Sequence, residues 1–213
     1  MTDDQHKARL IMALRRNGVR DTRVLEAMEE IPRDLFVPET FRDQAWADMA
    51  LPISCGQTIS QPFIVAYMTE QLELEPRMRV LEIGAGSGYQ AAVLSRLARR
   101  VYTIERHRPL LEAARERFEK LGLTNIETRV GDGSKGWPEA APFDRIIVTA
   151  AAAKTPQALL DQLAEDGVMI IPVESTPLYQ ELVRIRRTRE GFEREKLLPV
   201  RFVPLLKGVA RKS

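Results

Sequence analysis

A glycine-rich loop is the strongest candidate for chemistry in this sequence. The stretch VLEIGAGSGYQ, residues 80–90, places glycines at 84, 86 and 88 between a run typical of a strand and a run typical of a helix. Loops in this position bind nucleoside cofactors, because residues without side chains let a ligand lie against the backbone. Dinucleotide-binding loops need glycine at position 89, which is Tyr89 here. The spacing therefore argues against an NAD-dependent oxidoreductase.

Acidic residues end the two predicted strands nearest this loop. Glu82 comes just before the loop, where its charge would repel a pyrophosphate but would suit a cofactor with a positive centre. S-adenosylmethionine, which carries a sulfonium and an ammonium group, is such a cofactor. Glu105 ends the next strand, where a carboxylate can accept hydrogen bonds from both ribose hydroxyls.

A third predicted strand ends in GDG, residues 131–133, which offers a carboxylate and backbone amides to an adenine edge. Taken alone, a glycine loop can be only a tight turn, and Asp132 only part of an Asx turn. Suitable groups at three successive strand ends favour a cofactor site. The expected cofactor-binding residues are Glu82, Gly84, Ala85, Gly86, Ser87, Gly88, Glu105, Arg106, Asp132 and Gly133.

A second candidate site is GQTISQP, residues 56–62, which ends where a helix is predicted to begin. We expect Ser60 at the cap position of this helix and Pro62 in its first turn. Free backbone amides and the helix dipole then attract an anion to this end. A purely structural role for Ser60, as the cap of its own helix, is equally consistent with these residues.

The elements that position these motifs follow an α/β pattern. From Arg79 onward, short apolar runs alternate with amphipathic segments, which predicts a parallel sheet covered on both faces. Ahead of the sheet, helices are expected over 7–17, from Asp21 or Thr22, and from about Ser60 to before Glu75, with a packed connecting segment between the last two. The predicted strands include RVLEIG, RVYTIE, IETRVGD, FDRIIVTA and VMIIPV, followed by an antiparallel pair, ELVRIRRT and KLLPVRFVPLL, around the Gly191 turn.

Composition restricts the class of protein. The chain has 213 residues, 44% hydrophobic and 29% charged, which is typical of globular proteins. No apolar run approaches the roughly 18–20 residues of a membrane span, and the start lacks the apolar core of a signal peptide. The single cysteine, Cys55, cannot form an internal disulfide, and the two histidines are too few for a typical metal site. We therefore expect a cytoplasmic protein with a metal-free mechanism.

The charge balance argues against a nucleic-acid partner. The chain has 32 basic and 30 acidic residues, and its most basic stretch, residues 184–196, mixes six basic with three acidic residues. Interleaved charges of this kind are typical of a solvated surface. A monomer that binds neither nucleic acid nor membrane is expected.

Five segments together resemble the protein-L-isoaspartate O-methyltransferases of the bacterial type. The glycine loop is common to many methyltransferases, whereas GQTISQP ahead of the first sheet strand is specific to this family. The resemblance implies a single domain, residues 1–213: an N-terminal helical extension with the substrate motif (1–76), then a Rossmann-like, mostly parallel seven-stranded sheet with helices on both faces (77–213). The segments are GQTISQPFIVA (56–66), VLEIGAGSGYQAAVL (80–94), GDGSKGW (131–137), FDRIIVTAAA (143–152) and VRFVPLLKG (200–208).

The resemblance also implies an activity. It implies methyl transfer from S-adenosylmethionine to the free α-carboxylate of isoaspartyl residues in damaged proteins, and collapse of the ester to a succinimide. Ser60 would be the active-site residue. A core role for residues 203–205 is equally consistent with their types. The substrate-binding residues implied are Thr58, Ser60, Gln61, Val203, Pro204 and Leu205.

Some positions depart from the family pattern, and other classes share parts of it. Ser54, Glu174 and the loop 174–180 are atypical, which affects the expected substrate entrance rather than the reaction. A nucleic-acid methyltransferase would need a motif such as N-P-P-Y, or a cysteine, after the fourth strand, where this chain reads VTAAAA. A non-catalytic module that senses the cofactor would not need GQTISQP.

Overall fold

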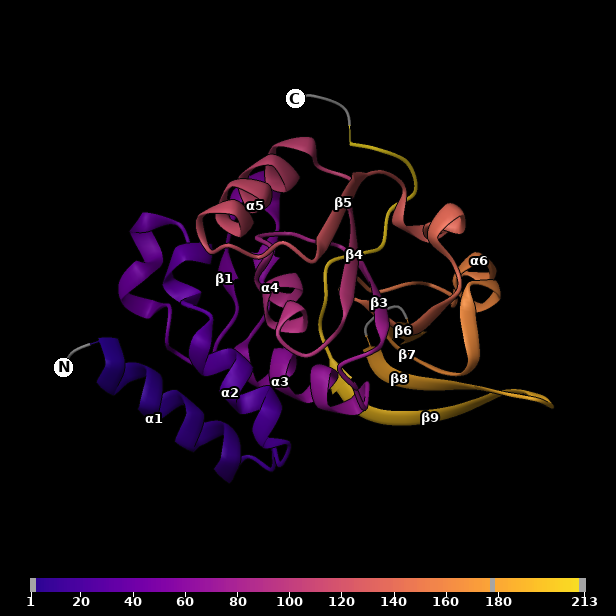
Figure 1. The fold of residues 1–213 in the computed structure, drawn as a ribbon, viewed down its shortest axis with the longest axis horizontal. Coiled ribbons are helices and arrows are strands. Elements are labelled where there is room, and N and C mark those ends of the chain that lie inside the picture. The colour runs from indigo at the N-terminus through magenta and orange to yellow at the C-terminus, as the bar shows by residue number, and fades with distance from the viewer. Residues whose placement is uncertain (1–2, 177–178, 211–213) are drawn as a thin grey trace.

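The computed structural model describes residues 3–176 and 179–210 and places a helical extension beside a seven-stranded sheet (Figure 1). The extension contains three helices, which form because apolar residues recur on one side of each of them. In α2 the side chain of Asp21 caps the helix by accepting a hydrogen bond from the amide of Arg23. The helices are α1 (Asp3–Arg16), α2 (Thr22–Glu30) and α3 (Pro62–Gln71).

The sheet has the strand order β5-β4-β3-β6-β7-β8-β9. The five strands from β5 to β7 are parallel, whereas β8 and β9 continue the sheet as an antiparallel pair. The chain order reverses at β3, and ligands bind beyond the carboxyl ends of the strands at such a point. The strands are β3 (Arg79–Ile83), β4 (Arg100–Glu105), β5 (Ile126–Val130), β6 (Phe143–Val148), β7 (Leu163–Thr176), β8 (Tyr179–Thr188) and β9 (Gly191–Val200).

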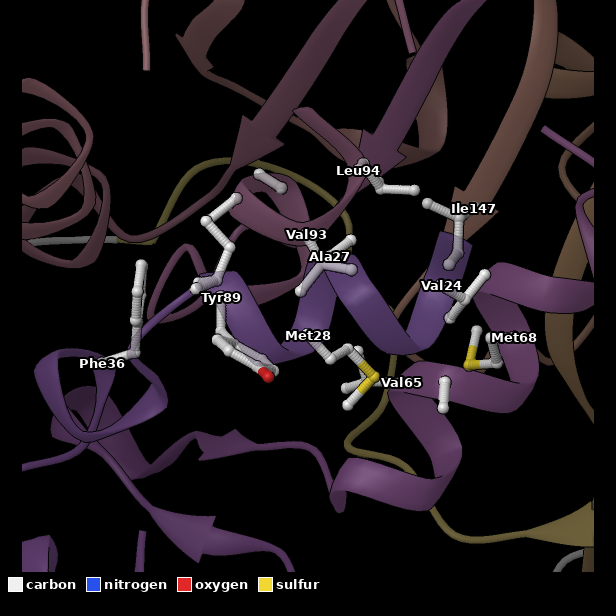
Figure 2. Close-up of a cluster of buried hydrophobic side chains, with 14 of the residues drawn as sticks. Val24, Ala27, Met28, Phe36, Val65, Met68, Tyr89, Val93, Leu94 and Ile147 are labelled. Atoms are coloured by element: carbon white, nitrogen blue, oxygen red, sulfur yellow. The ribbon is translucent and has the colours of Figure 1, made fainter. Parts of the chain in front are cut away.

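Alternation along the strands divides the buried side chains between two faces. Val80, Val101 and Ile147 pack in one cluster with the N-terminal helices, α4 (Tyr89–Ser95) and α5 (Arg108–Lys120). Figure 2 shows Val24 of α2 beside Met68 of α3, Met28 beside Val65, and Ala27 next to Val93 of α4. On the opposite face, Leu81 and Ile146 pack with the short α6 (Gln157–Asp161). The helical extension is therefore part of the main hydrophobic core.

The connecting segment after α2 is ordered, as expected. Its prolines lie at the edges of short elements, because proline cannot donate the backbone hydrogen bond that a longer element needs. The short elements are the 3₁₀ helices η1 (Arg33–Phe36), η2 (Glu39–Gln44) and η3 (Ser54–Gly56) and the strands β1 (Leu51–Pro52) and β2 (Thr58–Ile59). Two further 3₁₀ helices, η4 (Gly133–Lys135) and η5 (Pro138–Ala140), follow β5.

Two predicted elements end elsewhere in the structure. The last strand is Gly191–Val200, so RFVPLL lies outside it, because the side chain of Gln180 bonds both the amide and the carbonyl of Phe202 and the ladder stops there. The helix after β6 is also shorter than the spacing of Leu159, Leu160 and Leu163 predicts, because Leu163 begins β7. Part of the atypical loop 174–180, residues 177–178, lies outside the described residues.

Candidate active site

A cavity opens beyond the carboxyl ends of β3, β4 and β6. It is an open cleft of about 790 Å³, a volume that includes the solvent at its mouth. It brings together three regions distant in sequence: the strand β2, the glycine loop and the segment after β9. The predicted site residues that line it are Thr58, Ser60, Gly84, Ala85, Gly86, Ser87, Glu105, Arg106, Gly133, Val203, Pro204 and Leu205.

The glycine loop is held against the end of β6. Gly84 has φ +98°, and a Cβ atom there would lie 2.5 Å from Oγ1 of Thr149. That hydroxyl donates a hydrogen bond to the carbonyl of Gly84 at 2.7 Å. Only glycine fits both the conformation and the close approach, which explains the residue type at the first position of the loop.

Glu105 lies at the end of β4 with only 5% of its surface exposed. Its Oε2 accepts a hydrogen bond from the amide of Gly86 and its Oε1 accepts one from the amide of His107, both at 2.9 Å. A carboxylate has about four acceptor sites, so each oxygen keeps one for a ligand in the cavity. The fixed carboxylate therefore fits the two hydroxyls of a ribose.

Glu82 does not match its expected role. It is fully buried on β3, does not line the cavity, and accepts a hydrogen bond from Thr103, its neighbour on β4, at 2.5 Å. Burial raises the pKa of Glu82 to about 8, against the opposing effect of the Thr103 hydrogen bond. The group is mostly protonated at neutral pH, so it cannot supply a negative charge beside a positive cofactor.

Asp132 also lies behind the lining residues. One of its oxygens accepts hydrogen bonds from Ser134, and the other accepts one from the amide of Gly208 at 2.8 Å. Partial burial raises the pKa of Asp132, but the hydrogen bonds from Ser134 and Gly208 outweigh it and leave the pKa below its usual range. Asp132 thus anchors the C-terminal segment, while Gly133 faces the cavity. Gly88, the N-cap of α4, lies outside the lining as well.

Ser60 is not the cap of α3, contrary to expectation. The helix begins at Pro62, which is suited to a first helical position, and the N-cap is Gln61 without a side-chain hydrogen bond. The amide of Phe63 is instead capped by Oδ1 of Asp48 at 2.8 Å. Within residues 3–176 and 179–210, nothing hydrogen-bonds the Ser60 hydroxyl. The hydroxyl is therefore available to a ligand.

The segment after β9 forms one wall of the cavity. Backbone hydrogen bonds fix it to the loop after β6: the amide of Leu205 donates to the carbonyl of Ala151, and the amide of Ala151 donates to the carbonyl of Val203. Pro204 lies between these two anchors. Gln61 lines a second cavity that adjoins the first at Thr58 and Ser60.

Several lining residues escaped the sequence analysis. Thr149 directly follows β6, so the rule that ligands bind beyond strand ends could have identified it. Tyr89 and Gln90 open α4 and read as ordinary helix residues. Arg33 does not line the cavity, but it supports it: it is completely buried in η1 and donates a hydrogen bond to the carbonyl of Ser60 at 2.9 Å. No local pattern identifies such a residue, because its partners are distant in sequence.

The described residues contain neither a metal-binding cluster nor a membrane-spanning helix. Over residues 3–176 and 179–210, no group of three or more histidine, cysteine, aspartate or glutamate side chains is arranged to hold a metal ion. The same residues include no helix that is long and apolar enough to cross a membrane.

Sequence comparison gives consistent relatives over the full chain. The family model described as protein-L-isoaspartate(D-aspartate) O-methyltransferase matches residues 5–210. A protein-L-isoaspartate O-methyltransferase from Parvibaculum lavamentivorans is 64% identical, covering 99% of this chain and 96% of that protein. One from Rhodospirillum centenum is 62% identical, covering 100% of this chain and 97% of that protein.

Solved structures agree with the sequence relatives. A protein-L-isoaspartate O-methyltransferase superposes with a TM-score of 0.85 at 32% identity, covering 93% of this chain and 65% of that chain. A structure from Plasmodium falciparum described as the same enzyme, in complex with S-adenosyl-L-homocysteine, has a TM-score of 0.83 at 29% identity, covering 95% of this chain and 98% of that chain.

Proposed function

Because the chain belongs to the protein-L-isoaspartate(D-aspartate) O-methyltransferase family, we propose that its cavity holds S-adenosylmethionine and an isoaspartyl residue for carboxyl methylation. The observation that carries this proposal is the meeting of Glu105, the glycine loop and the free hydroxyl of Ser60 in one cavity. When bound, the cofactor supplies an electrophilic methyl group. The residues that would hold it are the glycines 84 and 86, Glu105 and Gly133.

The chain's own task is to orient an anion. An α-carboxylate with a pKa near ~3.5 is ionised at neutral pH, so its oxygen needs no general base. Ser60 and Thr58 would donate to the carboxylate oxygen that does not react and would replace its water with fixed donors. The wall formed by residues 203–205 would exclude solvent from the opposite side.

The product explains the biological role that we propose. A carboxylate resists attack, whereas its methyl ester can lose methoxide. The neighbouring backbone nitrogen therefore attacks the ester carbonyl, methanol leaves, and a succinimide closes without further help from the protein. Hydrolysis of that ring returns part of the damaged protein to normal aspartate. We further infer that the protein works as a cytoplasmic monomer. Its single cysteine, Cys55, is free and exposed, which suits a reducing compartment.

The decisive experiment is transfer of labelled methyl from S-adenosylmethionine to two peptides that differ only in one isoaspartyl or normal aspartyl residue. We expect the isoaspartyl peptide alone to be labelled, with a base-labile product, as expected of an ester. The rate should be unchanged by a chelator. Equal labelling of the two peptides, or a base-stable product, would contradict the proposed function.

A further inference from the structure

A second cavity, which we term the outer groove, adjoins the active site. It shares Thr58, Ser60, Thr149 and Val203 with the cofactor cavity. A peptide whose reacting carboxylate reaches Ser60 therefore has its flanking residues in the outer groove; this step rests on the proposed function. The other residues that line the groove are Ala50, Gln61, Ile64, Pro199, Val200, Arg201 and Phe202.

Arg201 is the one charged side chain among the described residues that line the outer groove. The remainder of the lining is apolar or carries neutral hydroxyl and amide groups, and it contains no carboxylate. The groove therefore has a positive charge and nothing in its own wall to balance it.

Two arginines on the neighbouring strand β8 are neutralised by carboxylates. Arg184 lies 2.6 Å from Glu195, and Arg186 lies 2.9 Å from Glu73. Even Glu181, on the strand beside Arg201, is paired with Lys196 at 2.7 Å. Across residues 3–176 and 179–210, Arg201 takes part in none of the ion pairs or side-chain hydrogen bonds. Its exposed guanidinium is thus left with its donors free.

The backbone at Arg201 is held in place. Val200 pairs with Gln180 in the sheet, and Gln180 then bonds the amide and the carbonyl of Phe202 at 2.6 and 3.1 Å. Arg201 lies between these two fixed residues at the point where β9 ends. Its side chain consequently projects from a rigid position at the groove rather than from a loose tail.

We propose that Arg201 is a specificity residue, which makes this protein prefer isoaspartyl sites flanked by an acidic side chain. A guanidinium recognises a carboxylate by charge and by paired hydrogen bonds. Because the site is exposed, the pair contributes modestly, roughly 3–5-fold in kcat/KM, and salt weakens it.

The test uses three peptides with one isoaspartyl core and glutamate, glutamine or lysine at a flanking position, scanned on both sides. At low salt we expect the wild-type kcat/KM to be highest for the glutamate peptide, intermediate for the glutamine peptide and lowest for the lysine peptide. The differences should be smaller at high salt. Arg201→Gln should remove the order without changing the rate on the glutamine peptide by more than about twofold. Arg201→Glu should reverse it. Arg189→Gln is the matched control, since Arg189 is 91% exposed in the β8–β9 hairpin and does not line the groove.

Three results would overturn the inference. The order could persist in Arg201→Gln, which would place the selecting charge elsewhere. All three peptides could lose rate equally in that variant, which would mean that Arg201 acts on the α-carboxylate common to them. The wild type could methylate all three equally, which would leave the proposed function intact and remove the preference. Failure of the wild type to methylate any peptide would instead contradict the proposed function itself.

Discussion

At the scale of single residues, the sequence analysis expected Ser60 both to cap α3 and to bind substrate, but the structure assigns the cap to Asp48. Asp48 caps α3, whereas the hydroxyl of Ser60 faces the cavity. Ser60→Ala should therefore keep the free energy of unfolding within about 0.5 kcal/mol of wild type. The same change should lower kcat/KM roughly 10²-fold, the amount expected for loss of a donor to a reacting anion.

The matched variant is Asp48→Ala, which should cost about 1 kcal/mol of stability, as loss of a helix cap does. Urea unfolding and initial-rate kinetics on an isoaspartyl peptide measure both quantities, and titration with S-adenosylhomocysteine checks that cofactor affinity is kept. If Ser60→Ala is as active as wild type, the carboxylate is held by Thr58, Gln61 or backbone amides instead.

Glu82 makes stability depend on pH. Its pKa is raised from an ordinary 4.5 to about 8 by burial, so the folded state holds a proton that the unfolded state has released. The stabilising effect of this proton is full below about pH 4.5 and is lost as pH rises towards 8. Between these limits the free energy of unfolding falls with a slope that approaches about 1.4 kcal/mol per pH unit.

Glu82→Gln should remove this slope, because glutamine is neutral at every pH. Urea unfolding from pH 5 to 8 should therefore show that the free energy of unfolding of the variant increases relative to that of the wild type as pH rises. Glu26→Gln, on an exposed position of α2, is the control and should follow the wild-type curve. Parallel curves for Glu82→Gln and wild type would show that Glu82 is already charged in the folded protein.

At the scale of elements, the sequence predicts the structural features that depend on residues close together in the chain. The apolar runs before residues 84, 106 and 131 become parallel strands, so the acidic strand ends meet at one edge of the sheet. The cap of α3 could not be predicted, because the capping carboxylate comes from Asp48 rather than from the residues just before the helix. The end of β9 depends likewise on Gln180, on another strand. Local patterns therefore predict the parallel strands and the glycine loop, whereas a cap or a strand end that depends on a distant residue is seen only in the structure.

Arg33 links the helical extension to both halves of the site. Its guanidinium donates to the carbonyls of Ala45 and Ser60, each at 2.9 Å, and lies 4.9 Å from the ring centre of Tyr89, next to the glycine loop. Lysine keeps the charge but lacks the planar fork needed to hold both carbonyls. We expect Arg33→Lys to act as a positioning change and lower kcat about tenfold, because small displacements of the Ser60 segment misalign the carboxylate.

A double-mutant cycle separates positioning from general destabilisation. If Arg33 acts through Ser60, then adding Arg33→Lys to Ser60→Ala should cost little further kcat, measured well below the unfolding temperature of both variants. Additive losses in kcat would contradict this link. They would leave Arg33 with a structural role only.

At the scale of the whole molecule, the C-terminal segment joins elements from both ends of the sheet. After β9 it runs past β4 towards β5, as the yellow trace in Figure 1 shows, and it hydrogen-bonds the loops after β4 and β5. Asp132 accepts from the amide of Gly208, and Arg106 accepts through its carbonyl from the amide of Ala210. These bonds hold the wall made by residues 203–206 against the cofactor cavity.

Asp132→Asn should therefore weaken binding of S-adenosylhomocysteine about tenfold, because it replaces a charge-assisted hydrogen bond to the segment with a weaker one. Deletion of residues 207–213 should weaken binding by a similar factor, since it removes the same anchor. If Asp132 acts through the segment, adding Asp132→Asn to the shortened chain should lower the affinity for S-adenosylhomocysteine little further, as measured by calorimetric titration. If Asp132 instead contacts the adenine directly, as the sequence analysis expected, the full tenfold loss should persist after the deletion. The two outcomes differ because a carboxylate of Asp132 that acts through the segment affects cofactor binding only while residues 207–210 are present.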